Sequence, residues 1–340
     1  MKFLILVVCV LGVVCKSPPK CEGMYNAHEI NMNEPVEVRR VPHGIRMHIE
    51  GSDIPLVHVE GTPYQMGYAM GQLLKEEATN LVDEVLNYFL NLGYEFVLEK
   101  FPLIEHIPKD WLFPIARFLA LKVADLNYLV VRHTIPNYFI EEMKGLGDGS
   151  GLGFWMIVEL AMIPEISKAQ CTILGAWGPA TEESLNGKLI QARALDWTVD
   201  GPFQKFQAII VYHPDQGHEF AILTFPGFTG ALTGMSATMG ISEKVWINTT
   251  METSRIGYPF PFMMRDIIQF DQTRFDAVTR MKSIPRTCTI FLGVGDSVTD
   301  EMTLVEYGYG DLHVYSDKNF TEWDTSKNGR HAFRYEINSP

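Results

Sequence analysis

The spacing of apolar residues divides the chain into two parts of different character. Between residues 55 and 165, apolar side chains recur every three to four positions, which is the period of an amphipathic helix. Thr62 followed by Pro63 is typical of a helix start, with a capping hydroxyl and then proline at the first helical position. Gly67 and Gly71, four residues apart, predict a helix face that another element can approach closely. The first part of the chain is therefore expected to be helical.

Further helical segments are expected before residue 171. The run LVDEVLNYFLNLGYEFVLEKF continues the helical period, and a second amphipathic run covers about residues 113–144. The glycine-rich stretch GLGDGSGLG at 145–153 predicts a turn between helices, and FWMIVELAM after it predicts another apolar helix. This glycine-rich stretch matches neither a dinucleotide-binding nor a phosphate-binding pattern.

From residue 171 onward the pattern changes to that of strands. CTILGAW and KLIQARALDW flank a polar loop, and FQAIIVYHPDQGHEFAILTF has the form of a hairpin with its turn at 214–217. Helices are expected at about 259–269 and 273–283, and strands at RTCTIFLGV, MTLVEYG and DLHVYS. Helices first, and then a mostly antiparallel sheet with two inserted helices, describe an α+β protein.

The N-terminal sequence MKFLILVVCVLGVVCKSPPK has the form of a secretory signal peptide. Residues 3–15 are an unbroken apolar run that is too short for a stable membrane anchor, which needs about 20 residues. We therefore assign residues 1–17 to the signal peptide. The remainder is expected to be a soluble protein of the secretory pathway, secreted or lysosomal, without a transmembrane anchor. Asn248 and Asn319 begin tripeptides that fit N-glycosylation on this route.

Composition and charge narrow the functional classes. Of the 340 residues 46% are hydrophobic, which is ample for one large domain or two ordinary ones. The formal net charge is -13 and the chain has no lysine–arginine cluster, so binding to nucleic acid is not expected. The acidity fits either simple solubility or residence in an acidic lumen, and both interpretations stay open.

The cysteines are too few for a disulfide scaffold. Cys9 and Cys15 lie in the signal peptide, which leaves Cys21, Cys171 and Cys288. No CxxC pair indicates zinc, and we expect no metal site and no other cofactor. An odd number of thiols in an oxidising compartment implies one bridge and one free cysteine.

Cys171 stands where the helical pattern gives way to the strand pattern, and it is either a small buried hydrophobe or a nucleophile. If the Gln170–Cys171 bond were cut, Cys171 would carry a free α-amino group with a pKa of about 8. Such an amine can serve as the general base for its own thiol. Arg193 and Asp196 follow in the predicted return strand, and a loop over about 178–187 would bring them beside Cys171. Taken alone, this pair could equally be a surface salt bridge.

Other polar and aromatic residues offer weaker candidates. Asn248 ends the strand-like KVWIN and could donate to an oxyanion, although a glycosylated loop is the simpler explanation. His213 and His218 flank the predicted turn and could meet as metal ligands, but two imidazoles without a third ligand indicate exposed turn positions. The aromatic residues of 87–120 are expected in core and chain–chain packing, with a lipid-accepting groove as the alternative.

Several segments occur in the order found in a known family. CTILGAWG…GKLIQARALDW has a cysteine first and Arg-x-x-Asp on the second strand, preceded by EGTPYQMGYAMGQLLKEE and EEMKGLGDGSG…ELAMIPE. Downstream lie GISEKVWIN and GYPFPFMMRDIIQF. Together these segments resemble the acid ceramidase and penicillin acyltransferase group of N-terminal nucleophile (Ntn) hydrolases. The resemblance covers roughly residues 57–310 and is closest to the acid-ceramidase-like branch.

This resemblance implies a fold and a maturation step. The fold is an αββα four-layer sandwich, with two antiparallel sheets between helical layers, preceded by a helical α-chain region. Self-cleavage before Cys171 would give a helical α chain or propeptide at 18–170 and a catalytic β chain with antiparallel sheets at 171–340. In this step Cys171 would attack the carbonyl of Gln170, take the acyl group as a thioester and release it to water.

The resemblance also implies an activity. Cys171 would attack the carbonyl of an amide in an N-acyl lipid-like substrate, such as a ceramide or an N-acylethanolamine, through a thioester. Arg193 and Asp196 would hold the new amine and the substrate in place. In acid ceramidases a disulfide links the two chains, and Cys21 with Cys288 could do the same here, in agreement with the number of thiols.

Two departures from the family keep other functions open. The interval from Cys171 to Arg193 is longer than in acid ceramidase, and HAFRYEINSP ends where a strand with a second oxyanion asparagine is expected, of which Asn338 could be a remnant. The alternatives are an acyltransferase, a phospholipase-B-like ester hydrolase of the same superfamily, and a non-catalytic secreted protein that retains the fold. For a lipid-like substrate, contact with a membrane surface is a further expectation.

Overall fold

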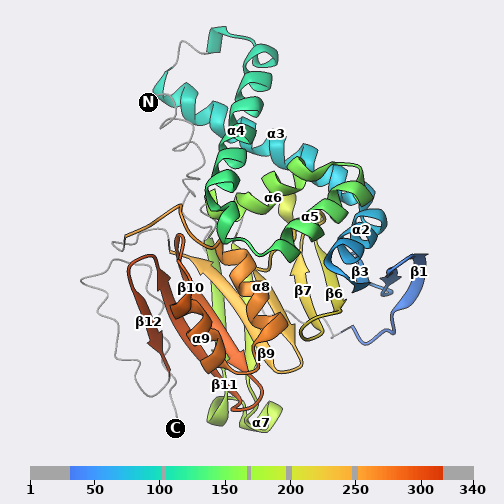
Figure 1. Ribbon diagram of the computed structural model, residues 1–340, viewed down its shortest axis with the longest axis vertical. Helices are drawn as coiled ribbons and strands as arrows, with labels where there is room; N and C mark the ends of the chain where they lie inside the picture. The colour runs from blue at the N-terminus through green and yellow to red at the C-terminus, as the bar shows by residue number, and fades with distance from the viewer. Residues whose placement is uncertain (1–30, 102–104, 167–169, 197–200, 247–251, 317–340) are drawn as a thin grey trace. The chain divides into compact units, whose positions relative to one another are not determined.

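The computed structural model describes residues 31–101, 105–166, 170–196, 201–246 and 252–316. These residues form a mixture of helices and strands (Figure 1), which confirms the predicted α+β class. The chain separates into two compact units, of which unit 1 comprises 1–169 with 197–231 and unit 2 comprises 170–196 with 232–340. Several predictions made above lie outside the described residues: the signal peptide, Cys21, Asn248, Asn319 and Asn338.

Unit 1 combines a sheet with a set of long helices. Its strands have the order β1-β2-β3-β6-β7, in which β3 and β6 are parallel and the other neighbours are antiparallel. The elements are β1 (Val36–Val41), β2 (Gly44–His48), β3 (Leu56–Gly61), α2 (Pro63–Leu73), α3 (Lys75–Lys100), α4 (Lys109–Val131), η2 (Arg132–Thr134), α5 (Asn137–Ser150), α6 (Phe154–Ile166), η4 (Pro202–Gln204), β6 (Ala208–Pro214) and β7 (Phe220–Thr224).

The first strands correct the expectation of a purely helical N-terminal part. β3 occupies the start of the segment that we predicted as helical, and β1 and β2 precede it. In β3 the side chains of Val57 and Val59 are buried while Glu60 is exposed, which is the two-residue alternation of a strand. The helix begins where predicted, because Thr62 and Gln65 form a reciprocal capping box before Pro63.

The glycine face of α2 packs against α5, as the spacing of Gly67 and Gly71 predicted. A Cβ added to Gly67 would lie 2.2 Å from the carbonyl oxygen of Glu142, so only glycine allows this approach. Gly145 of α5 is equally close to α2, since its Cβ would lie 2.1 Å from the carbonyl oxygen of Tyr64. The prediction that 145–153 is a turn is therefore wrong for its first part. These glycines continue α5 and serve helix–helix contact, and the chain turns only after Ser150.

The described part of unit 2 is built from antiparallel strands, two longer helices and short helical segments between its first two strands. The strands β8 to β12 pair in chain order, and β4 and β5 form a separate two-stranded sheet. The elements are β4 (Gln170–Ala176), η3 (Gly178–Ala180), α7 (Glu182–Leu185), β5 (Ile190–Asp196), β8 (Thr233–Ser236), β9 (Met239–Val245), α8 (Phe260–Phe270), α9 (Arg274–Ser283), β10 (Thr289–Asp296), β11 (Glu301–Gly308) and β12 (Leu312–Tyr315).

The β4–β5 hairpin and the two helices cover opposite faces of this sheet. α8 and α9 lie in front of the strands in Figure 1, and the hairpin lies behind them on β9, β10 and β11. Gln191 of β5 fixes the hairpin, because its Nε2 donates to Ser242 Oγ at 2.7 Å and to the Gly293 carbonyl at 3.0 Å. The resulting order of helices, sheet and second sheet within unit 2 agrees with the layered sandwich that the family resemblance implies.

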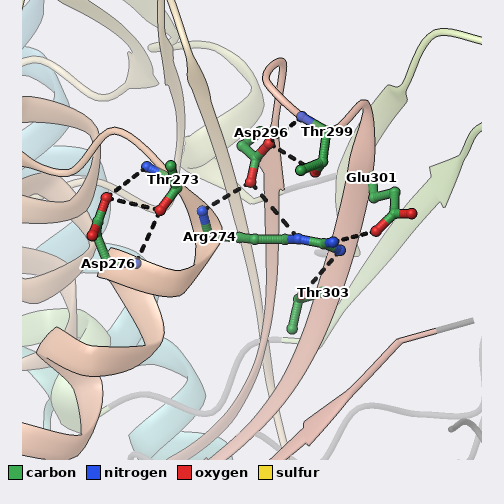
Figure 2. Close-up of polar contacts among 7 residues, drawn as sticks. All are labelled: Thr273, Arg274, Asp276, Asp296, Thr299, Glu301 and Thr303. Atoms are coloured by element: carbon green, nitrogen blue, oxygen red, sulfur yellow. Dashed lines mark hydrogen bonds and ion pairs between the residues drawn. The ribbon is translucent and has the colours of Figure 1, made fainter. Parts of the chain in front are cut away.

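A charged cluster fastens the N-terminus of α9 to the turn between β10 and β11 (Figure 2). The backbone N–H of Arg274 donates to Asp296 Oδ2 at 2.9 Å, and its guanidinium group pairs with Glu301. Thr299 donates to the other oxygen of Asp296 from its hydroxyl and its backbone N–H, at 2.8 Å each. Since the Asp296 side chain is fully buried, these donors provide the hydrogen bonds that a buried carboxylate requires.

Candidate active site

The return hairpin expected from the sequence is present and places the candidate residues together. β4 and β5 are antiparallel, with Cys171 opposite Leu195, Ile173 opposite Arg193 and Gln170 opposite Asp196. The connection between the two strands contains η3 and α7, and it is slightly longer than the loop predicted at 178–187. Hairpin pairing therefore places Asp196 opposite Gln170, at the proposed processing bond, and Arg193 opposite a residue two positions after Cys171.

Arg193 is the residue that connects the hairpin with the sheet of unit 2. Its Nη2 donates to the Sγ of Cys171 at 3.0 Å and to Glu243 Oε1 at 2.5 Å. Its Nε donates to the backbone carbonyl of Glu243 at 2.9 Å, and its Nη1 to Thr233 Oγ1 at 3.3 Å. Four hydrogen bonds hold the planar guanidinium in one orientation, with one of its edges toward the thiol.

Cys171 is completely buried in the uncut chain, and its thiol is not activated there. Burial raises the pKa of this thiol to about 12, and the negative charge of Glu243 acts in the same direction. The guanidinium of Arg193 opposes both effects, because it lies beside the sulfur and favours the thiolate. Before any cleavage the sulfur is therefore protonated, in contact with both a cation and a carboxyl group.

Asp196 lies near the same end of the hairpin but faces solvent. Its Oδ2 accepts a hydrogen bond of 2.8 Å from the hydroxyl of Thr172, the residue that follows Cys171. This contact orients the carboxylate along the first residues of β4. An ammonium group formed on Cys171 would appear at this end of the strand, opposite Leu195 and next to the Gln170–Asp196 pair.

Glu243 is a member of the cluster that the sequence did not single out. Its side chain is 3% exposed, and its Oε1 lies 3.7 Å from Cys171 Sγ. Burial raises the pKa of Glu243, whereas Arg193 counteracts this shift. The signal in the sequence was an acidic residue inside the apolar strand GISEKVWIN, where burial of a carboxylate demands a partner. Lys244, next in the strand, is half-buried, and burial lowers its pKa.

The structure does not bring the other sequence candidates to this cluster. His213 contacts His58 of β3 instead of His218, with 3.0 Å between His58 Nδ1 and His213 Nε2, and its Nδ1 lies 2.9 Å from Glu219. Parallel pairing of β3 with β6 produces this contact, which the local turn pattern could not reveal. Across the described ranges, no group of three or more His, Cys, Asp or Glu side chains could hold a metal ion. Cys288 is half-buried, and its proposed partner lies outside the described residues.

No family model matches this chain, and two solved structures are weakly similar to it. The N-acylethanolamine-hydrolyzing acid amidase ortholog of Caenorhabditis elegans is 16% identical with a TM-score of 0.34, over 43% of this chain and 63% of that one. A variant of the conjugated bile acid hydrolase from Clostridium perfringens is 11% identical with a TM-score of 0.24, over 44% of this chain and 43% of that one.

Curated relatives are more similar in sequence. An uncharacterized protein of Archaeoglobus fulgidus is 27% identical over 80% of this chain and 46% of its own length. Protein dcd1B of Dictyostelium discoideum is 35% identical over 84% of this chain and 57% of its own length, so the chain spans about half of each of these two relatives. Protein dcd1A of the same organism is 35% identical over 92% of this chain and 73% of its own length. The chain therefore belongs to the family of protein dcd1A.

Proposed function

We propose that this protein is a self-processing cysteine amidase of the Ntn-hydrolase type, with Cys171 as its nucleophile. The observation that carries this proposal is the 3.0 Å contact between Arg193 Nη2 and Cys171 Sγ, in a hairpin that also holds Asp196 near the Gln170–Cys171 bond. A buried structural cysteine needs no guanidinium beside its sulfur, since arginine is costly to bury. A nucleophile does, because a neighbouring cation favours the thiolate.

The first reaction is cleavage of the Gln170–Cys171 peptide bond. The Sγ of Cys171 attacks the Gln170 carbonyl carbon, the C–N bond breaks, and the acyl group moves from nitrogen to sulfur. The thiol proton passes to the released nitrogen, and Glu243 Oε1, 3.7 Å from the sulfur, can carry it there. Water then hydrolyses the thioester to a Gln170 carboxylate and the Cys171 thiol.

The second reaction is turnover of an external amide. The new α-amino group of Cys171 has an ordinary pKa of about 8, close to that of a thiol, so in its unprotonated form it can accept the thiol proton. The thiolate attacks the substrate carbonyl, the protonated amine returns its proton to the leaving nitrogen, and water releases the acyl group. Arg193 stabilises the thiolate and Asp196 holds the ammonium. Asn248 remains the proposed oxyanion donor.

The substrate that we propose is an N-acyl lipid or a related acyl amide, met in the secretory pathway or the lysosome. The acid-ceramidase-like segments of the sequence support this class, and the N-terminal apolar run supports this route. We further propose that Cys21 and Cys288 join the two chains after cleavage, and that Asn319 is a glycosylation site. Glycosylation of Asn248 is the alternative to its role as oxyanion donor, since one side-chain amide cannot serve both.

The decisive experiment compares the secreted protein with Cys171→Ala and with the matched control Cys288→Ala. Each is incubated at mildly acidic pH, and its intact mass and N-terminal sequences are determined. A fragment that begins CTILGAW in the wild type and in Cys288→Ala, but not in Cys171→Ala, is the expected result. Intact chains in all three samples would contradict self-processing and favour the non-catalytic alternative.

Product analysis then separates the two enzymatic classes. The cleaved protein is given an N-acylethanolamine and a ceramide, each with and without an added amine acceptor. Free fatty acid in both conditions is expected for an amidase. A new amide that forms only with the acceptor would identify an acyltransferase instead.

A further inference from the structure

Helix α4 presents a stripe of large apolar side chains to solvent. Its exposed large side chains are Trp111 (72% exposed), Ile115 (61%), Phe118 (60%), Leu126 (54%) and Leu129 (57%). At about 100° per residue these positions fall within an arc of about 80°, and the stripe is about 27 Å long at about 1.5 Å per residue. A largely apolar face of this length on the outside of a folded unit, with Lys122 at its middle, indicates a binding surface.

The stripe is the outer face of a helix whose inner face is already packed. Ala124, Tyr128 and Val131 of α4 are buried, and Asn127 contacts Met162 of α6 at 3.4 Å. α4 therefore does not need its outer face to hold its place in unit 1. The apolar residues there cost free energy in water unless something covers them.

The charges on α4 differ in sign from those of the whole chain. α4 carries three cations, Lys109, Arg117 and Lys122, and two anions, Asp110 and Asp125, a net charge of 3 − 2 = +1 in a chain of -13. Lys122 is the charged residue within the stripe itself, and its ammonium pairs with Asp125. An apolar helix face with a net positive charge fits a partner whose interior is apolar and whose surface groups are anionic.

The beginning of α4 adds the aromatic residues that favour the edge of a bilayer. Lys109 Nζ lies 4.4 Å from the ring centroid of Tyr94 and 5.6 Å from that of Phe113, and the exposed Trp111 follows Lys109 by two residues in α4. Aromatic rings beside long cationic side chains are typical of the boundary between lipid head groups and acyl chains. No helix within the described ranges combines the length and the apolarity that crossing a bilayer would require.

We propose that α4 is a membrane-docking element that lies along the surface of a phospholipid bilayer. Its stripe from Trp111 to Leu129 enters the acyl-chain boundary, and Lys122 extends its ammonium group toward the lipid phosphates. This inference stands apart from the chemistry of Cys171, because α4 contains none of the residues assigned to the reaction.

Vesicle flotation tests this docking element with a matched pair of variants. Ile115→Glu places a charge in the stripe, and Ile256→Glu does the same at an isoleucine with the same exposed fraction, 61%, in unit 2. All proteins carry Cys171→Ala, so that each is the same uncut chain and failure of catalysis cannot affect the result. The probes are vesicles of phosphatidylcholine alone and of phosphatidylcholine mixed with phosphatidylserine.

The expected result is flotation of the Cys171→Ala chain and of its Ile256→Glu derivative, stronger with phosphatidylserine and weaker at high salt. Ile115→Glu should bind about tenfold or more weakly, because one buried isoleucine is lost from the lipid contact. Equal flotation of the two glutamate variants, or no flotation of the parent, would overturn the proposal. A dimer in sedimentation that Ile115→Glu dissociates, without vesicle binding, would assign the stripe to contact between copies.

Discussion

Unit 2 contains two arginine–carboxylate clusters that differ in what else they hold. Arg193 pairs with Glu243 and donates to the sulfur of Cys171, whereas Arg274 pairs with Glu301 and Asp296 and contacts the hydroxyl of Thr303 (Figure 2). Both guanidinium groups are largely buried, with 8% and 10% of the side chain exposed. Burial of an arginine among carboxylates is therefore common to both clusters and does not by itself indicate a catalytic site.

The two clusters differ in the other groups that contact each arginine. Around Arg274 the polar partners are carboxylates and a hydroxyl group, which fix α9 to β10, β11 and the turn between them. Around Arg193 one partner is a thiol at the start of a strand, and Asp196 at the same end of the hairpin is open to solvent. A cluster becomes a candidate active site when it holds a reactive atom near a place that a substrate can reach.

The largest expected effect is on the rate of chain cleavage, which should depend on Arg193 and not on Arg274. Arg193→Met should slow formation of the fragment that begins at Cys171 by about a hundredfold or more. The variant removes the cation that favours the thiolate and leaves the Glu243 carboxyl group beside the sulfur, and each unit of thiol pKa is worth about tenfold in thiolate. The measurement is the cleaved fraction over time, by intact mass.

Arg274→Met is the control for this prediction. It should cleave at the wild-type rate below its melting transition, although it loses about 1.5–3 kcal/mol of unfolding free energy, because Glu301 loses its ion pair and Asp296 keeps only backbone N–H groups and Thr299 as donors. Circular dichroism verifies that both variants are folded. Normal cleavage in Arg193→Met, or equal loss of cleavage in a folded Arg274→Met, would show that the two clusters are equivalent.

The two clusters also differ in how far the sequence could predict them. Arg193 and Asp196 could be placed beside Cys171 because a single hairpin connects them and local strand patterns predict hairpins. Glu243 could not, because its place depends on packing of the hairpin against β9, a contact between residues 72 positions apart. The Arg274 cluster escaped prediction for the same reason, since Asp296 and Glu301 come from later strands.

Prediction of the fold from the sequence is limited in the same way, because it succeeds for local features and fails for contacts between distant residues. Helices α2, α8 and α9 and the hairpins could be located from caps, prolines and alternation, which are properties of neighbouring residues. The glycines of α5 looked like a loop because their use, close contact with α2, depends on residues about eighty positions earlier. Short strands such as β3 were included in the helical part because a helical period dominates the residues that follow.

The second prediction compares the carboxylates that neutralise the two arginines, in a Cys171→Ala background so that all chains stay uncut. Glu243→Gln should lower the unfolding free energy by about 3 kcal/mol, because Arg193 then keeps a buried charge without its counter-ion. Glu301→Gln should cost less than about 1 kcal/mol, since the Glu301 side chain is 23% exposed and water screens the loss. Urea unfolding at neutral pH measures both, and a larger effect at Glu301 would contradict the comparison.

The third prediction extends the comparison to a carboxyl group whose neighbour is another acid. Burial, and then the nearby Asp125, raise the pKa of Glu159 to about 7, whereas for Asp296 hydrogen bonds from Arg274 and Thr299 outweigh burial and lower the pKa. The ordinary glutamate value applies to Glu159 in the unfolded chain. The folded protein therefore binds the extra proton between about pH 4.5 and 7, and it loses stability as the pH rises through this window.

The expected loss across that window is about 3.5 kcal/mol, because the pKa rises by about 2.5 and each pKa unit corresponds to about 1.4 kcal/mol. Urea unfolding of the Cys171→Ala chain at mildly acidic and at neutral pH measures it. Glu159→Gln should remove most of the slope, whereas Asp296→Asn should lower the stability above about pH 4 without removing the slope. An unchanged slope in Glu159→Gln would exclude this carboxyl group as its cause.

The smallest effect is expected at two threonines that each donate a hydroxyl to an aspartate at 2.8 Å, Thr172 to Asp196 and Thr299 to Asp296. Thr172→Val removes the contact that orients Asp196 while the valine keeps the shape and the strand preference of threonine. One hydrogen bond of about 1 kcal/mol corresponds to about fivefold, so cleavage before Cys171 should slow by about that factor. Thr299→Val should leave the cleavage rate unchanged and lower the melting temperature by a few degrees. If Thr172→Val lowered the melting temperature and left cleavage at the wild-type rate, Asp196 would be a structural partner of β4 and the distinction between the two clusters would rest on Cys171 and Arg193 alone.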